Sequence, residues 1–179
     1  FKEKIMKIGI LIDVLDEHSG ARAGPMLARA MAVAAPSDEF VILTALNRLS
    51  LRAQESFPPN LKTIVFKKSL FISFDLWQKI RGEKIRLVSA HCSLRLLITA
   101  RLAGAYLVRT DYGSQFPSLN NSFYGWRPRV PYGIINYIGD VWVYFRDYLK
   151  FVFSHENIGI SQDNALKAKR LYGQKIDFI

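Results

Sequence analysis

Three short segments rich in polar or small residues follow apolar runs, which is where parallel α/β proteins carry their ligand-binding groups. The first offers glycine backbone near a helix start, the second an imidazole, and the third a carboxylate beside a phenol. The candidate residues are Ser19 and Gly20 in the first segment, His91 in the second, and Asp111, Tyr112 and Gly113 in the third. The sequence has no P-loop, no nucleophile–base pair and no metal-ligand spacing. Hydrogen bonding and proton acceptance are therefore the chemistry to expect.

The glycine-containing segment, residues 16–25, reads DEHSGARAGP. Gly20 and Gly24 would let the backbone approach a ligand closely, and the N-terminus of the following helix would favour a phosphate or another anion. An ordinary strand-to-helix turn has the same composition, so both interpretations stay open.

The other two segments differ in their ability to hydrogen-bond a ligand or to accept a proton from it. His91 could hydrogen-bond a ligand hydroxyl or cap the next helix, and the sequence does not separate these roles. Tyr112 is a poor base at neutral pH, because the pKa of a phenol is near 10. Asp111 beside it could instead accept a proton from a hydroxyl.

Strand-like runs alternate with helix-like runs along most of the chain. The continuous apolar run at residues 8–14 predicts a central strand covered on both faces. Further strands are expected at residues 40–45, 61–66, 86–90, 106–110 and 158–160, and helices at residues 25–35, 74–80, 94–103 and 164–172. This alternation predicts a doubly wound α/β fold with about seven strands in a mainly parallel, Rossmann-like sheet. Such a sheet would bring the three candidate segments to one edge.

Residues 114–153 interrupt this pattern. A stretch rich in Ser, Asn, Pro, Gly and aromatic residues includes Arg127 and Arg129 and reads as a long loop. The aromatic helix expected at residues 134–153 has two interpretations. It could lie at a membrane interface, or it could be buried against the sheet. Asp140 and Asp147 favour burial, because an anionic surface would repel them.

Size and composition indicate one globular domain spanning residues 1–179. Half of the residues are apolar, and the single cysteine, Cys92, excludes an internal disulfide. No run of about 20 apolar residues is long enough for a transmembrane helix, and the chain begins directly with a strand-like run. We therefore expect a cytoplasmic protein that could touch a membrane face peripherally.

The formal net charge of +10 is concentrated after residue 60. Residues 1–60 hold seven basic and seven acidic side chains, whereas residues 61–179 hold eighteen basic and eight acidic ones. A positive field of this kind favours nucleic acid, acidic lipid or phosphorylated substrates. The sequence has no helix-turn-helix, RRM or KH signature, so a nucleic-acid partner is not expected.

Three stretches in the right order resemble the N-terminal domain of the retaining glycosyltransferases of family 4. The chain's last part is similar to "D-x-I-I-A-V-S … LYG … V-I-P-N-G-V-D", and it breaks off within the final piece. Residues 87–113 are similar to "D-V-V-H-A-H … R-L-A-G-V-P-V-V-x-T-x-H-G", with Ser89 and Tyr112 where the family has His. Residues 7–35 are similar to "K-I-L-x-x … G-G-x … L-A-x-A-L-A". Together these stretches cover about two-thirds of the chain.

The resemblance implies one half of a two-domain GT-B fold, the acceptor side of an enzyme that moves a sugar from a nucleotide-sugar donor. Ser19 and Gly20 would lie near the donor phosphates, with His91, Tyr112 and Gly113 around the sugar. Retention of anomeric configuration would need no cofactor and no metal. The donor nucleotide would be held chiefly by a second, C-terminal domain, so this chain alone is expected not to catalyse transfer.

The acceptor is expected to be a sugar or a lipid-linked, anionic molecule, with Arg127 and Arg129 receiving it. A different class stays open: a basic α/β domain that binds a phosphorylated ligand, nucleic acid or a membrane surface without catalysis.

Overall fold

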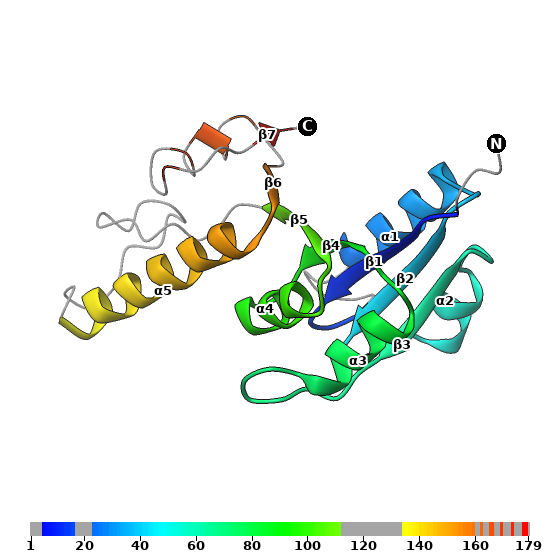
Figure 1. Ribbon diagram of the computed structural model, residues 1–179, viewed down its shortest axis with the longest axis horizontal. Helices are drawn as coiled ribbons and strands as arrows, with labels where there is room; N and C mark the ends of the chain where they lie inside the picture. The colour runs from blue at the N-terminus through cyan, green and yellow to red at the C-terminus, as the bar shows by residue number, and fades with distance from the viewer. Residues whose placement is uncertain are drawn as a thin grey trace.

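The computed structural model describes residues 5–16, 23–111 and 134–159, with 162, 165, 166, 169, 173, 177 and 178. Within these residues, seven parallel strands form one sheet in the order β3-β2-β1-β4-β5-β6-β7 (Figure 1). The strands are β1 (Lys7–Ile12), β2 (Glu39–Thr44), β3 (Leu61–Val65), β4 (Leu87–His91), β5 (Tyr106–Asp111), β6 (Glu156–Gly159) and β7 (Asp177–Phe178). The helices are α1 (Ala23–Ala34), α2 (Leu51–Glu55), α3 (Phe74–Gly82), α4 (Leu94–Leu102) and α5 (Ile134–Phe153). The predicted parallel, Rossmann-like fold is confirmed.

Strand β1 is buried on both faces, as its continuous apolar sequence predicted. Ile8, Ile10 and Ile12 point to one face of the sheet and pack in a cluster with α1. Leu11 points to the opposite face and joins the larger cluster beneath α3 and α4. Because side chains alternate along a strand, one apolar run fills two hydrophobic layers.

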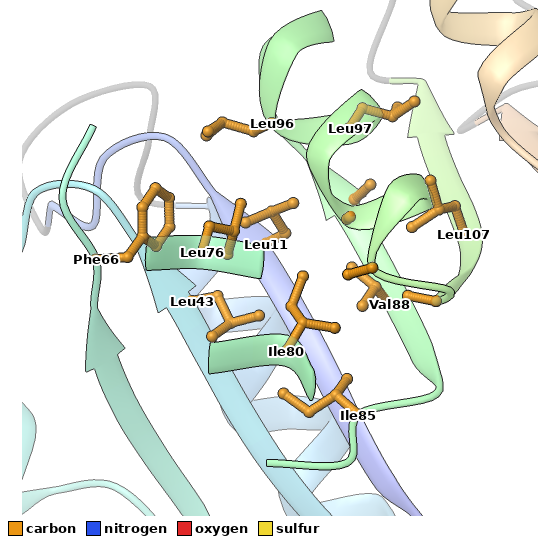
Figure 2. Close-up of a cluster of buried hydrophobic side chains, with 14 of the residues drawn as sticks. Leu11, Leu43, Phe66, Leu76, Ile80, Ile85, Val88, Leu96, Leu97 and Leu107 are labelled. Atoms are coloured by element: carbon orange, nitrogen blue, oxygen red, sulfur yellow. The ribbon is translucent and has the colours of Figure 1, made fainter. Parts of the chain in front are cut away.

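The larger cluster holds α3 and α4 on the sheet (Figure 2). Leu76 and Ile80 of α3 are fully buried against strand residues that include Leu11 and Leu43. Phe66, the residue after β3, closes one end of this cluster and is also buried. The layer positions the loops that leave the carboxyl ends of β3 and β4.

Two local expectations differ from the structure. The short helix α2 was not predicted. Ser50 caps it by accepting a hydrogen bond from the Ala53 N–H at 3.2 Å. The helix expected at residues 74–80 extends to Gly82 as α3, and the left-handed residue after it is Lys84, with φ of 57°. The corresponding left-handed position after α4 is Gly104, so glycine is used at one of the two turns only.

Among the side chains of α5 that the structure describes, some are buried and others are exposed. Asp147 and Phe151 are buried, and the helix packs on α4. Trp142 and Phe145 are 64% and 50% exposed. Burial against the fold and an exposed aromatic side therefore coexist in one helix, and the charged Asp147, bonded to Lys150 at 3.1 Å, faces inward.

None of the helices within the described ranges combines the length and apolar character needed to span a bilayer.

Candidate functional site

The candidate site lies where the strand order switches direction. Strands β1, β2 and β3 progress toward one side of the sheet, whereas β4 to β7 progress toward the other, so the loops after β1 and β4 diverge. Ile12 at the end of β1 pairs with His91 at the end of β4. In open parallel sheets a crevice forms at this carboxyl-edge switch point and receives ligands.

Asp13, directly after β1, binds the beginning of α4. Its Oδ2 accepts the Ser93 backbone N–H at 2.5 Å and its Oδ1 accepts the Ser93 hydroxyl at 3.0 Å. Ser93 is the N-cap of α4, yet its own side chain makes no capping hydrogen bond. The chain's own carboxylate thus occupies the helix N-terminus where an anionic ligand would otherwise be favoured.

His91, the last residue of β4, lies at the same carboxyl edge and is partly buried. Its Nε2 lies 2.9 Å from the Ser89 Oγ, and residues 89 and 91 share one face because they are two apart on a strand. Burial lowers the pKa of His91 to about 4. The imidazole is therefore neutral at neutral pH, so it can exchange hydrogen bonds with hydroxyls but carries no charge for a phosphate. It does not cap α4, a role that belongs to Ser93 and Asp13.

The loop after β3 also reaches Asp13 and the beginning of α4. Lys68 Nζ lies 3.6 Å from Asp13 Oδ1, and Arg95 Nη1 donates to the Ser69 carbonyl oxygen at 3.3 Å. Loops after β1, β3 and β4 therefore meet around Asp13.

The remaining candidates are placed only in part. Asp111 is the last residue of β5 and pairs with Gly159 of β6, so its backbone lies at the same carboxyl edge. The other sequence candidates fall outside the described residues: Ser19, Gly20, Tyr112, Gly113, Arg127 and Arg129. Among the described residues, no cluster of His, Cys, Asp or Glu could hold a metal ion.

A distinct pocket of about 380 Å³ lies at the opposite, amino edge of the sheet. His155 there stacks on Tyr106, with ring centroids 4.2 Å apart, and its Nδ1 accepts the Leu107 N–H at 2.9 Å. Two arginines, Arg86 and Arg101, also line this pocket.

Sequence reasoning missed Asp13 and Lys68. A signal for Asp13 was present, because it is the first carboxylate after a central strand that ends in the predicted crevice. Lys68 gave none, since its contact with Asp13 depends on how the β3–α3 connection crosses the sheet edge.

We expect Asp13→Ala to lower the free energy of unfolding by about 1–2 kcal/mol, because two donors at the start of α4 lose their acceptor. Asp13→Asn should cost less, since one carbonyl oxygen still accepts. Urea unfolding followed by circular dichroism measures both. Glu55→Ala, at the exposed end of α2, is the control and should stay within about 0.5 kcal/mol of the wild type. Equal stability of Asp13→Ala and the control would show that the carboxylate does not hold α4.

Comparison with solved structures finds the same fold in three other proteins. A protein named as a UDP-N-acetylglucosamine 2-epimerase, from Listeria monocytogenes, superposes with a TM-score of 0.55 at 10% identity, over 91% of this chain and 41% of that one. A glycosyltransferase from Rickettsia africae gives 0.54 at 12% identity, over 98% and 42%. UGT2 from Phytolacca americana, solved with UDP-2-fluoro-glucose and pterostilbene, gives 0.58 at 9% identity, over 97% and 53%.

These likenesses show the fold, because the identities are too low to carry more. The chain spans 41% to 53% of the length of those proteins. The sequence matches no protein-family model and no curated protein.

Proposed function

We propose that this chain is the acceptor-side, N-terminal domain of a glycosyltransferase that moves a sugar from a nucleotide-sugar donor to a hydroxyl acceptor. The observation that carries the proposal is the contact of Asp13 with Ser93 and Lys68 at the carboxyl edge, in a fold shared with a glycosyltransferase over 98% of this chain. Asp13 fills the N-terminus of α4 and would repel a diphosphate there. A carboxylate and a neutral imidazole suit sugar hydroxyls, so this part of the carboxyl edge fits an acceptor better than a nucleotide.

The roles of individual residues follow from this arrangement. His91, neutral at the working pH, would hydrogen-bond a sugar hydroxyl. Asp111 would accept the proton of the attacking hydroxyl, and Tyr112 would hydrogen-bond a sugar oxygen. Ser19, Gly20 and Gly113 would border the donor, while Arg127 and Arg129 would attract an anionic or lipid-linked acceptor.

The finer assignment is the retaining mechanism of family 4, which rests on the three stretches of sequence resemblance. In that arrangement a second domain, C-terminal to this one, holds most of the donor nucleotide, and no metal ion takes part. The share of about half or less that this chain covers in the similar structures supports a two-domain enzyme.

We expect the isolated chain to bind nucleotide sugars weakly or not at all. Calorimetry with the common UDP- and GDP-sugars measures this directly. A dissociation constant of about 1–10 μM, which corresponds to roughly −7 to −8 kcal/mol, would mean that the domain holds the donor by itself and that the two-domain proposal is wrong.

The acceptor assignment has its own test in the transferase that joins this chain to a donor-binding domain. Asp13→Asn and His91→Gln should raise the KM for the acceptor and leave the dissociation constant of the donor unchanged. An effect on donor binding with no change for the acceptor would assign the crevice to the donor.

A second candidate function is a basic domain that binds a phosphorylated ligand without catalysis. The pocket lined by Arg86, Arg101 and His155 favours it, because two guanidinium groups there suit a phosphate. Titration with inorganic phosphate, comparing wild type with Arg86→Gln/Arg101→Gln, separates this function from the first.

A further inference from the structure

The loop between β3 and α3 exposes consecutive large apolar side chains at its tip. Leu70 and Phe71 are 85% and 82% exposed, and Ile72 is about half exposed. We call these three residues the apolar tip. They project at the carboxyl edge of the sheet, beside the candidate site, and the first residue of α3, Phe74, is exposed next to them.

The loop is tied down at both ends, so its exposure is built into the fold. At one root the Lys67 N–H donates to Asp75 Oδ2 at 2.6 Å. At the other, the buried Ser73 donates its hydroxyl to the Lys67 carbonyl oxygen at 2.7 Å and its N–H to Thr99 Oγ1 at 3.2 Å. These bonds close the loop at its base and hold the tip outward.

Cations stand behind the apolar tip. Lys67 and Lys68 precede the tip, separated from it by Ser69, and both are exposed. Residues 66–74 include no acidic side chain. Two carboxylates lie at the base: Asp13 beside Lys68, and Asp75, which also pairs with Lys79 at 3.7 Å. This arrangement matches an anionic bilayer, because the apolar tip can contact the acyl chains while the lysines contact the negatively charged headgroups.

Along helix α3 the side chains also change from apolar near the tip to charged farther away. Phe74 stacks on Trp77 with centroids 5.4 Å apart, and the Arg81 guanidinium lies 5.3 Å from the Trp77 ring centroid. Phe74 and Arg81 are about 10 Å apart along the helix axis. The side chains therefore change from apolar at the tip to an aromatic pair and then to a cation. A membrane protein shows the same order from the acyl region to the phosphates.

We propose that residues 67–74 dock this domain onto an anionic membrane surface, with Leu70 and Phe71 inserted among the lipids. A convex tip of large apolar side chains can enter a bilayer without a complementary groove, whereas a protein partner would have to supply one. The lysines beside the tip indicate that the surface it binds is negatively charged. The proposed docking loop is a different segment from the one that includes Arg127 and Arg129.

Docking through this loop would carry the candidate site to the membrane. Lys68 and Ser69, which adjoin the tip, contact Asp13 and Arg95 at the crevice. This consequence rests on the proposed function, since it would present the site to a lipid-linked acceptor. The docking itself does not depend on sugar transfer.

Co-sedimentation of the 179-residue chain with vesicles tests the proposal. Wild type should bind vesicles of phosphatidylcholine mixed with phosphatidylglycerol, and more weakly those of phosphatidylcholine alone. Leu70→Ser/Phe71→Ser should lower the partition coefficient about tenfold or more on both. Lys67→Gln/Lys68→Gln should lower it severalfold on the mixed vesicles at low salt only.

The matched control is Val33→Ser/Leu51→Ser, which removes two exposed apolar side chains from α1 and α2 and should bind as wild type does. Absence of wild-type binding would overturn the proposal, as would equal binding by the tip variant. It would also fail if Trp142→Ser/Phe145→Ser abolished binding while the tip variant retained it.

A label at the loop gives a second readout. Burial raises the pKa of the Cys92 thiol, so an added exposed cysteine reacts first. A polarity-sensitive dye on Ser69→Cys should shift to the blue with mixed vesicles, whereas the same dye on Val33→Cys should not. No shift at position 69 would contradict insertion. Transfer to a soluble acceptor by the joined transferase should be unchanged in the tip variant, so a failure of docking and a failure of the proposed function give different results.

Discussion

Replacing Phe66 by alanine is expected to lower the free energy of unfolding by about 3–5 kcal/mol, whereas Phe71→Ala should change it by less than about 0.5 kcal/mol. The two phenylalanines are five positions apart, on either side of the lysine pair. Phe66 is 2% exposed and packs in the cluster with Leu11 and Leu76 (Figure 2). Its removal leaves a cavity beneath α3, while removal of Phe71 empties no space.

Urea unfolding of both variants, followed by circular dichroism, measures the difference. The pair also checks the premise of membrane docking, because Phe71 is available to lipid only if the fold does not use it. A loss above about 2 kcal/mol in Phe71→Ala would mean that the tip is packed against the protein in solution. Equal small losses in both variants would mean that Phe66 does not close the cluster.

The sheet was predictable because its signals are local. The run at residues 8–14 has no polar residue before Asp13, which is typical of a strand covered on both faces. The next strands followed from apolar runs separated by Gly and Pro. Helix α2 was missed because five residues with no buried side chain leave no periodic pattern. Helix α3 ends two residues beyond the predicted end, because composition does not show which residue after a helix takes positive φ, and here it is Lys84.

The site was predictable only in outline. His91 could be placed at the carboxyl edge from its position after a strand, and the structure puts it there. The bond from Ser93 to Asp13 joins residues 80 positions apart, so it depends on β1 and β4 being neighbours. The sequence of the tip, Leu-Phe-Ile, is indistinguishable from a core segment until the hydrogen bonds at its roots turn it outward. The Ser93–Asp13 bond and the exposure of the tip therefore depend on the topology of the fold and not on composition.

The lowered pKa of His91 makes the free energy of unfolding depend on pH. In the unfolded chain its pKa is near 6.5, whereas in the fold it is about 4, because burial disfavours the charged imidazolium. Above about pH 6.5 the residue is neutral in both states, and its contribution to the free energy of unfolding is fully present. As the pH falls toward 4, the unfolded chain takes up the proton first, and stability is lost. Between about pH 7.5 and 4.5 this loss amounts to about 2 kcal/mol.

His91→Gln removes this contribution, because glutamine keeps hydrogen-bonding groups and does not titrate. We expect the wild type to lose about 2 kcal/mol more than His91→Gln when urea unfolding is repeated across that pH range. Titrating carboxylates contribute to both proteins, and so does His155, so their effects cancel in the difference. Parallel pH profiles would show that His91 is solvated enough to protonate normally. It could then carry a positive charge near pH 6, and the crevice would become suitable for an anion. The two outcomes therefore separate a site for neutral hydroxyls from a site for phosphate.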